Sequence, residues 1–226
     1  MKILALDTST EACSVALLNG AELHSRYVVQ PRKHAALILP MLEEVLTEAG
    51  MILGDLDALA FGCGPGSFTG VRIATATAQG VAASVNLTVI PVSSLAAIAQ
   101  RAVDEKGTEK IACAIDARMG EVYWGCYRQN NEGVVELEGT ECVIAPQAVP
   151  VPQGSGWTGA GTGWSAYEES LILRMGPALL DLNAGLLPNA AALAKLAAVD
   201  FQQGKTVSAG KALPVYLRNQ VARKPI

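Results

Sequence analysis

Residues 2–20 read KILALDTSTEACSVALLNG, and this stretch decides the fold class. Two short β-prone runs, Ile3–Asp7 and Cys13–Leu18, flank a polar turn, and Asn19-Gly20 follows them as a strong hairpin signal. A third β-prone run covers Glu22–Val29. The sequence therefore predicts an antiparallel meander of three strands at the start of the chain.

The pattern of strand, acid, turn and strand occurs a second time. Ala114-Ile115-Asp116-Ala117 resembles Ala5-Leu6-Asp7-Thr8, and a further β-prone run, Glu121–Arg128, follows it. A repeated supersecondary plan suggests two lobes that are built alike. We therefore predict a two-lobed α/β fold of the actin/sugar-kinase/Hsp70 type, with residues 1–104 as the N-terminal lobe. Residues 105–226 would form a reduced second lobe with a basic tail, because the regular pattern fades after its third strand.

The composition is that of a folded protein with a substantial core. Half of the 226 residues are hydrophobic, 17% are charged, and 17 basic against 21 acidic residues give a net charge of −4. A disordered chain shows the reverse balance. The acidity also argues against a protein that binds nucleic acid on its own through a general basic surface.

The cysteines and the uncharged segments indicate the compartment. Five scattered cysteines without a CxxC motif suggest reduced, mostly buried thiols. The uncharged stretch 73–100 is too polar and too interrupted for a membrane span, which needs about 20 predominantly apolar residues. We therefore expect a cytoplasmic protein with no membrane partner.

Three helices are predicted in the first lobe, and the third covers about Ser94–Val103 with Ser93 as its N-cap. The first two each have a face that requires burial. An apolar stripe runs along His34–Ala49, and a helix at 71–84 that follows the glycine-rich loop Gly62–Gly70 carries small side chains at a spacing of four. Such faces pack either inside the lobe or against a partner helix. The expected partner interface consists of Leu37, Met41, Val45, Val71, Ala74, Ala78 and Ala82.

The turn after the first strand is the candidate ligand site. Asp7, Thr8, Ser9 and Thr10 offer a carboxylate, hydroxyls and backbone amides, which can hold a phosphate and hydrated magnesium. The alternative is an ordinary Asx turn. If the chain is an enzyme, it is a nucleotide-dependent kinase or hydrolase that uses Asp7 and Asp116. The two histidines show no metal-ligand spacing, so no histidine-based metal site is predicted.

Three motifs resemble one family. Ile3–Thr10, Gly64–Arg72 and Pro214–Arg218 together are similar to the TsaB (YeaZ) family, which bacteria need for threonylcarbamoyl-adenosine modification of tRNA. The resemblance implies a non-catalytic paralogue of TsaD, which transfers the threonylcarbamoyl group from its adenylate to N6 of the adenosine beside the anticodon. TsaD holds a metal with histidines on a helix where this chain has only His34.

The resemblance also implies the partners. The chain would form a heterodimer with TsaD through its N-terminal lobe, the ATPase TsaE would join it, and tRNA would be contacted through the complex. The isolated chain would be a monomer or a homodimer. No stably bound cofactor is expected; ATP or ADP would bind at a shared interface, and Asp7–Thr10 would be the remnant of a phosphate turn.

Overall fold

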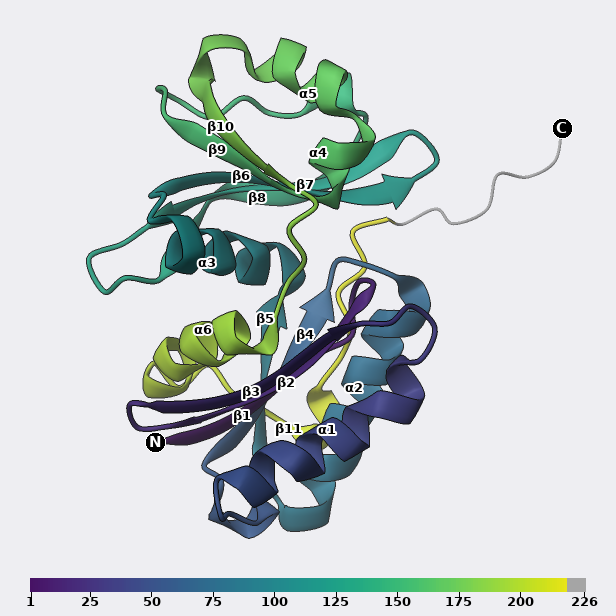
Figure 1. Ribbon diagram of the computed structural model, residues 1–226, viewed down its shortest axis with the longest axis vertical. Helices are drawn as coiled ribbons and strands as arrows, with labels where there is room; N and C mark the ends of the chain where they lie inside the picture. Colours follow the sequence, from purple (N-terminus) through teal and green to yellow (C-terminus); the bar gives the residue numbers. More distant parts are fainter. Residues whose placement is uncertain (219–226) are drawn as a thin grey trace, which may run out of the picture.

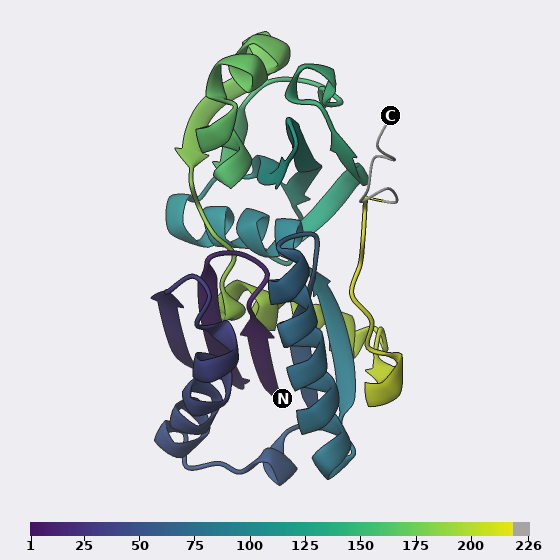
Figure 2. The ribbon, with the colours of Figure 1, turned by 90° about the vertical axis from the view of Figure 1, so that its right-hand side faces the viewer.

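Residues 1–218, which the computed structural model describes, form two mixed β-sheets with helices between and outside them (Figures 1 and 2). The first sheet has the strand order β11-β5-β4-β1-β2-β3. Its strands are β1 (Lys2–Asp7), β2 (Ala12–Asn19), β3 (Glu22–Val29), β4 (Ala58–Gly64), β5 (Thr88–Ser93) and β11 (Val207–Ser208). β1, β2 and β3 are antiparallel neighbours, so the predicted meander is confirmed.

The second sheet repeats the first. Its order is β10-β9-β6-β7-β8, with strands β6 (Lys110–Arg118), β7 (Glu121–Gln129), β8 (Val135–Ile144), β9 (Trp157–Gly161) and β10 (Leu179–Ala184). In both sheets an antiparallel meander is followed by two parallel strands on the side of its first strand. The predicted duplication is confirmed, and the fold is the two-lobed actin-like type.

The helices separate the two sheets and cover their outer faces (Figure 1). They are α1 (His34–Glu48), α2 (Phe68–Val85), α3 (Ser94–Lys106), α4 (Thr162–Ala166), α5 (Glu168–Met175) and α6 (Ala190–Gln202). Short 3-10 turns occupy Leu53–Asp55, Pro146–Ala148, Gly176–Ala178 and Ala209–Lys211. α1 and α2 cover the outer face of the first sheet, α4 and α5 that of the second, and α3 and α6 lie between the sheets. No helix within residues 1–218 combines the length and the apolar character that crossing a membrane requires.

The predicted lobe boundary is wrong at its C-terminal end. α6 packs on β1 and β2 of the first sheet, and β11 pairs with β5, so the chain returns to the first lobe after β10. The second lobe is therefore an insertion that ends well before residue 226. The reason is the apolar face of α6, where Leu193 and Ala197 are fully buried in a core that they share with Ile3 and Ala5.

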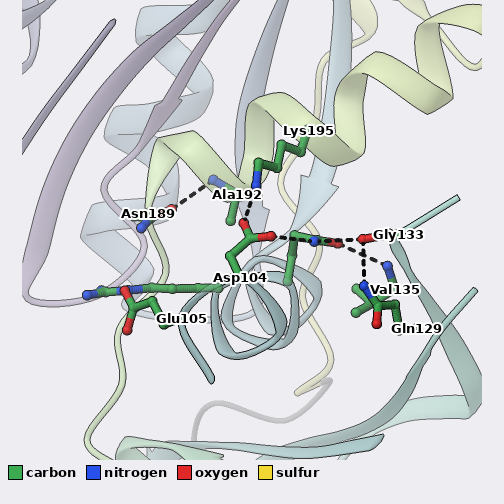
Figure 3. A network of polar contacts seen from close by, with 10 residues as sticks. Asp104, Glu105, Gln129, Gly133, Val135, Asn189, Ala192 and Lys195 are labelled. Carbon is green, nitrogen blue, oxygen red and sulfur yellow. Dashed lines mark hydrogen bonds and ion pairs between the residues drawn. The ribbon is translucent and has the colours of Figure 1, made fainter. Parts of the chain in front are cut away.

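The buried Gln100 joins the lobes next to this shared core. Its partners Asp104, Gly133 and Val135 are labelled in Figure 3. Gln100 on α3 donates from Nε2 to Asp104 Oδ1 and to the Gly133 carbonyl, each at 3.1 Å, and its Oε1 accepts the Val135 amide at 3.0 Å. Asp104 also accepts from Lys195 Nζ on α6 at 2.8 Å. The turn between β7 and β8 is thereby connected through α3 to α6 of the first lobe.

We expect Gln100→Leu to lower the free energy of unfolding by about 2 kcal/mol, because the buried Val135 amide loses its acceptor. The Gly133 carbonyl still accepts from Gln129 Nε2, so it keeps a hydrogen-bond partner in this variant. Lys195→Met is the control, since a half-exposed ion pair contributes less than about 1 kcal/mol. Urea unfolding checks both, and equal losses in the two variants would contradict this assignment.

Candidate functional site

The predicted phosphate turn lies at the end of β1 and is closed. Asp7, Thr8 and Ser9 have no exposed surface, and Thr10 has 7%. Asp7 Oδ1 accepts from the Ser9 amide and from Ser9 Oγ, both at 3.0 Å. Burial raises the pKa of Asp7 from 3.8 to about 6, although the bonds from Ser9 oppose the shift.

The glycine-rich loop after β4 closes the turn. The Ser67 amide donates to the Ser9 carbonyl at 2.7 Å, and Thr8 Oγ1 donates to the Gly70 carbonyl at 2.7 Å. The approach is so close that a Cβ on Gly70 would lie 2.0 Å from the Thr8 carbonyl oxygen. The expectation that this turn presents free hydroxyls is therefore corrected for Thr8 and Ser9, whose hydroxyls bond to the loop and to Asp7. Ser9 and Thr10 also line the cleft between the lobes.

Asp116, at the matching position in the second lobe, has a different environment. Its carboxylate pairs with Arg118 Nη1 at 2.8 Å, and Tyr167 Oη donates to it at 3.4 Å. Asp116 lines the cleft between the lobes, whereas Asp7 does not. The two carboxylates that a kinase or hydrolase would use do not share one open site.

The cleft between the lobes has a volume of about 1180 Å³. The first lobe contributes the end of the β1–β2 turn, the start of α1 and the start of α2; the second lobe contributes the end of β6 and the start of α4. Arg72 and Tyr216 belong to its wall, and sequence reasoning did not single them out as site residues. Arg72 ends the motif Gly64–Arg72, and Tyr216 lies within the motif Pro214–Arg218. Membership of these two motifs was the sequence signal that could have identified both residues.

The C-terminal segment, residues 213–218, runs from the first lobe to the second (Figure 2), and its Val215, Tyr216 and Arg218 line the cleft. The Val215 amide donates to the Cys63 carbonyl at 2.8 Å, and Tyr216 Oη accepts from Arg72 Nε at 2.9 Å. On the other side, Arg218 pairs with Glu121 at the start of β7. Arg218 is one of the basic residues of the predicted tail, and it is engaged in this ion pair. Arg223 and Lys224 lie outside the described residues.

The predicted partner interface is largely part of the core of the first lobe. Met41 and Val45 of α1 and Val71, Ala74, Ala78 and Ala82 of α2 are all buried on the inner faces of these helices, and only Leu37 is half-buried. The prediction was wrong for these six positions, because the small side chains of α2 allow this helix to pack closely on the sheet and on α1. A periodic stripe shows that a face is buried but not which surface covers it.

The opposite faces of α1 and α2 are the surfaces that remain open. Leu39 is 54% exposed, Ala76 is exposed, and Ile73 is half-buried. Gly80 is exposed as well, and a Cβ there would meet no atom within 4 Å. This face of α2 therefore lets another chain approach its backbone closely.

All five cysteines are free thiols. Burial raises the pKa of Cys13 to about 11 and that of Cys63 and Cys126 to about 12. These thiols are protonated at neutral pH, and thiols are poor nucleophiles in that form. Within the described range, no three His, Cys, Asp or Glu side chains gather in a way that could hold a metal ion.

Known proteins share both the sequence and the fold. Residues 18–160 match the model of the TsaD family, tRNA N6-adenosine threonylcarbamoyltransferase. The tRNA threonylcarbamoyladenosine biosynthesis protein TsaB of Escherichia coli K12 is 46% identical over the whole chain and 98% of its own length, and that of Haemophilus influenzae is 42% identical over 100% and 97%. YeaZ from Pseudomonas aeruginosa is 51% identical, with a TM-score of 0.90 over 96% of this chain and 99% of the other. This chain therefore belongs to the TsaB family and takes part in the biosynthesis of threonylcarbamoyladenosine in tRNA.

Proposed function

We propose that this chain is a non-catalytic subunit that activates TsaD in threonylcarbamoyl transfer to tRNA. The observation that carries the proposal is the closed turn at Asp7. In an enzyme of this fold the acid of the turn would face its ligand, but here Asp7 is fully buried and does not line the cleft, and Thr8 and Ser9 bond to the glycine loop. The turn stabilises the lobe, and the chemistry takes place on the partner.

The partner surface in this proposal is the exposed face of α1 and α2. Leu39, Ile73, Ala76 and Gly80 provide apolar area and close backbone access, and the exposed Glu43 and Glu44 follow Leu39 on α1. A helix pair of TsaD would bury this face and extend the layer that α1 and α2 form on the sheet. TsaE would join the pair, ATP or ADP would bind at their shared interface, and tRNA would reach this chain through the complex.

Ala76→Glu is expected to weaken binding to TsaD at least about a hundredfold, because it would bury an unpaired charge at a close helix contact. The same change at an exposed apolar position on α5 of the second lobe, Leu173→Glu, is the control. Isothermal titration with purified TsaD measures both affinities, and thermal melting establishes that both variants are folded. Normal binding by Ala76→Glu would remove this face from the interface.

Reconstitution tests the non-catalytic role. TsaD, TsaE, tRNA and threonylcarbamoyl-adenylate are combined with and without this chain, and modified adenosine is quantified. We expect no product from this chain alone, strong stimulation when TsaD is present, and near-normal stimulation by Asp7→Asn. Turnover by the chain alone, or loss of stimulation by a folded Asp7→Asn variant that still binds TsaD, would favour a nucleotide-dependent kinase or hydrolase.

A further inference from the structure

The two lobes are tied together on one side of their junction, away from the cleft. The chain passes into the second lobe at residues 107–109 and returns at 185–189. Ser93 at the end of β5 and Tyr127 on β7 both donate to Glu141 on β8, which adds a link between the lobes. None of these residues lines the cleft. This side of the junction can therefore act as a hinge, because the covalent crossings keep the lobes together there.

A strap crosses the other side of the junction. It consists of residues 213–218, which run from the first lobe to the second (Figure 2). Its Val215, Tyr216 and Arg218 line the cleft. Residues 213–218 belong to no helix or strand. The position of the strap therefore depends on the contacts at its two ends.

The end of the strap on the first lobe is built into that lobe. Ala212, from which the strap starts, is fully buried in the core beneath α2, and its carbonyl accepts from Gln79 Nε2 at 2.8 Å. The Val215 amide donates to the Cys63 carbonyl, also at 2.8 Å. Freeing this end would expose a core residue and break both backbone contacts at once, so we expect it to stay in place.

The end of the strap on the second lobe depends on a single side chain. Arg218 pairs with Glu121 at the start of β7, and its Nη2 also donates to the Arg118 carbonyl at 3.3 Å. Among the hydrogen bonds and ion pairs within residues 1–218, only those of Arg218 link the strap to this lobe. The side chain of Glu121 is 39% exposed, and a partly exposed ion pair contributes little to stability. This end can therefore come free while both lobes stay folded.

The turn that receives Arg218 has an unusual backbone. Arg118 and Met119, between β6 and β7, have φ angles of +62° and +57°, a left-handed conformation that is uncommon for residues other than glycine. Such conformations persist where surrounding contacts maintain them, and they cluster in segments that switch. Arg218 supplies contacts of this kind to the Arg118 carbonyl and, from Nη1 at 3.3 Å, to Met119 Sδ. The turn and the strap therefore support each other.

We propose that the strap sets the opening of the interlobe cleft, and that the contact between Arg218 and Glu121 is its latch. The latch opens and closes while the rest of the strap stays on the first lobe. With the latch closed, both sides of the junction are tied and the lobes keep one relative orientation. With the latch open, only the hinge side holds, and the second lobe can turn about it. The device requires only this chain, so it is independent of the proposed action on TsaD.

Residual dipolar couplings, measured by NMR on the free protein, test the proposal because they report the orientation of one lobe relative to the other. We expect the couplings of both lobes of the native protein to fit one common alignment. Arg218→Gln should abolish this common alignment: each lobe should still fit by itself, which shows that it is folded, but the two lobes should give different alignments. Glu121→Gln removes the same ion pair from the second lobe and should give the same result.

Arg128→Gln is the matched control. It removes a guanidinium that pairs with Glu138, but both partners belong to the second sheet, so the common alignment should remain. Hydrogen exchange at the Val215 amide separates an open latch from a detached strap, and it should be as slow in Arg218→Gln as in the native protein. A common alignment in either latch variant, its loss in Arg128→Gln or in the native protein, or fast exchange at Val215 in Arg218→Gln would overturn the proposal.

Discussion

Gly70→Ala should lower the free energy of unfolding by about 3 kcal/mol, near the upper end of what overpacking usually costs. The added carbon would lie 2.0 Å from the Thr8 carbonyl oxygen. That oxygen belongs to the backbone of the closed turn, so it cannot move away as the end of a flexible side chain would. The turn and the start of α2 would have to separate, and the hydrogen bond from Thr8 Oγ1 to the Gly70 carbonyl would be strained or lost.

Gly80→Ala in the same helix is the matched control. A Cβ at Gly80 meets nothing within 4 Å, so this change should stabilise the protein by up to about 1 kcal/mol through helix propensity. Urea unfolding of both variants measures the contrast. If Gly70→Ala were as stable as the native protein, the glycine loop would not be what closes the turn.

Asp7→Asn should stabilise the protein at neutral pH by about 3 kcal/mol. The pKa of Asp7 is about 6 in the folded protein against 3.8 as the reference value, a difference of 6 − 3.8 = 2.2 pKa units. The folded state therefore binds the proton more tightly than the unfolded state. The stability that this carboxyl contributes is fully present below about pH 4 and is lost as the pH rises through about 6. Asparagine stays neutral and avoids this loss.

The pH dependence distinguishes this cause from a general effect of charge. We expect the difference in unfolding free energy between Asp7→Asn and the native protein to be small at pH 4 and to level off above about pH 7. Asp181→Asn removes the same charge from an exposed position on β10 and serves as the control. A gain at Asp7 that did not change with pH, or an equal gain at Asp181, would contradict the buried ionisation.

Local patterns predicted most of the elements, because hairpin turns and helical stripes act over a few residues. Asn19-Gly20 marked the hairpin between β2 and β3, which are antiparallel neighbours. Ser93 caps α3 by accepting the amides of Leu95 and Ala96. β10 and β11 were missed. β11 has only two residues, and such a short edge strand exists because β5 offers it hydrogen bonds, not because of its own sequence.

The site was harder to predict, because its properties depend on contacts between distant parts of the chain. Asp7–Thr10 read as an open turn, but the loop that closes it lies more than fifty residues later. Likewise, the stripe at Ala74, Ala78 and Ala82 showed a buried face without showing that the first sheet covers it. The motif at Pro214–Arg218 could be quoted, but its position across the cleft follows from tertiary contacts with Cys63 and Glu121.

The return of α6 to the first sheet also determines the order in which this protein can fold during synthesis. The sheet face that carries Ile3, Ala5 and Ala16 leaves the ribosome early, whereas its cover, residues 190–202, is made last. At about 5–20 residues per second, this apolar face waits roughly 10–35 seconds for α6. The nascent first lobe therefore remains incomplete until the whole inserted lobe has been translated, and over that interval its uncovered strands are open to chaperones and to aggregation.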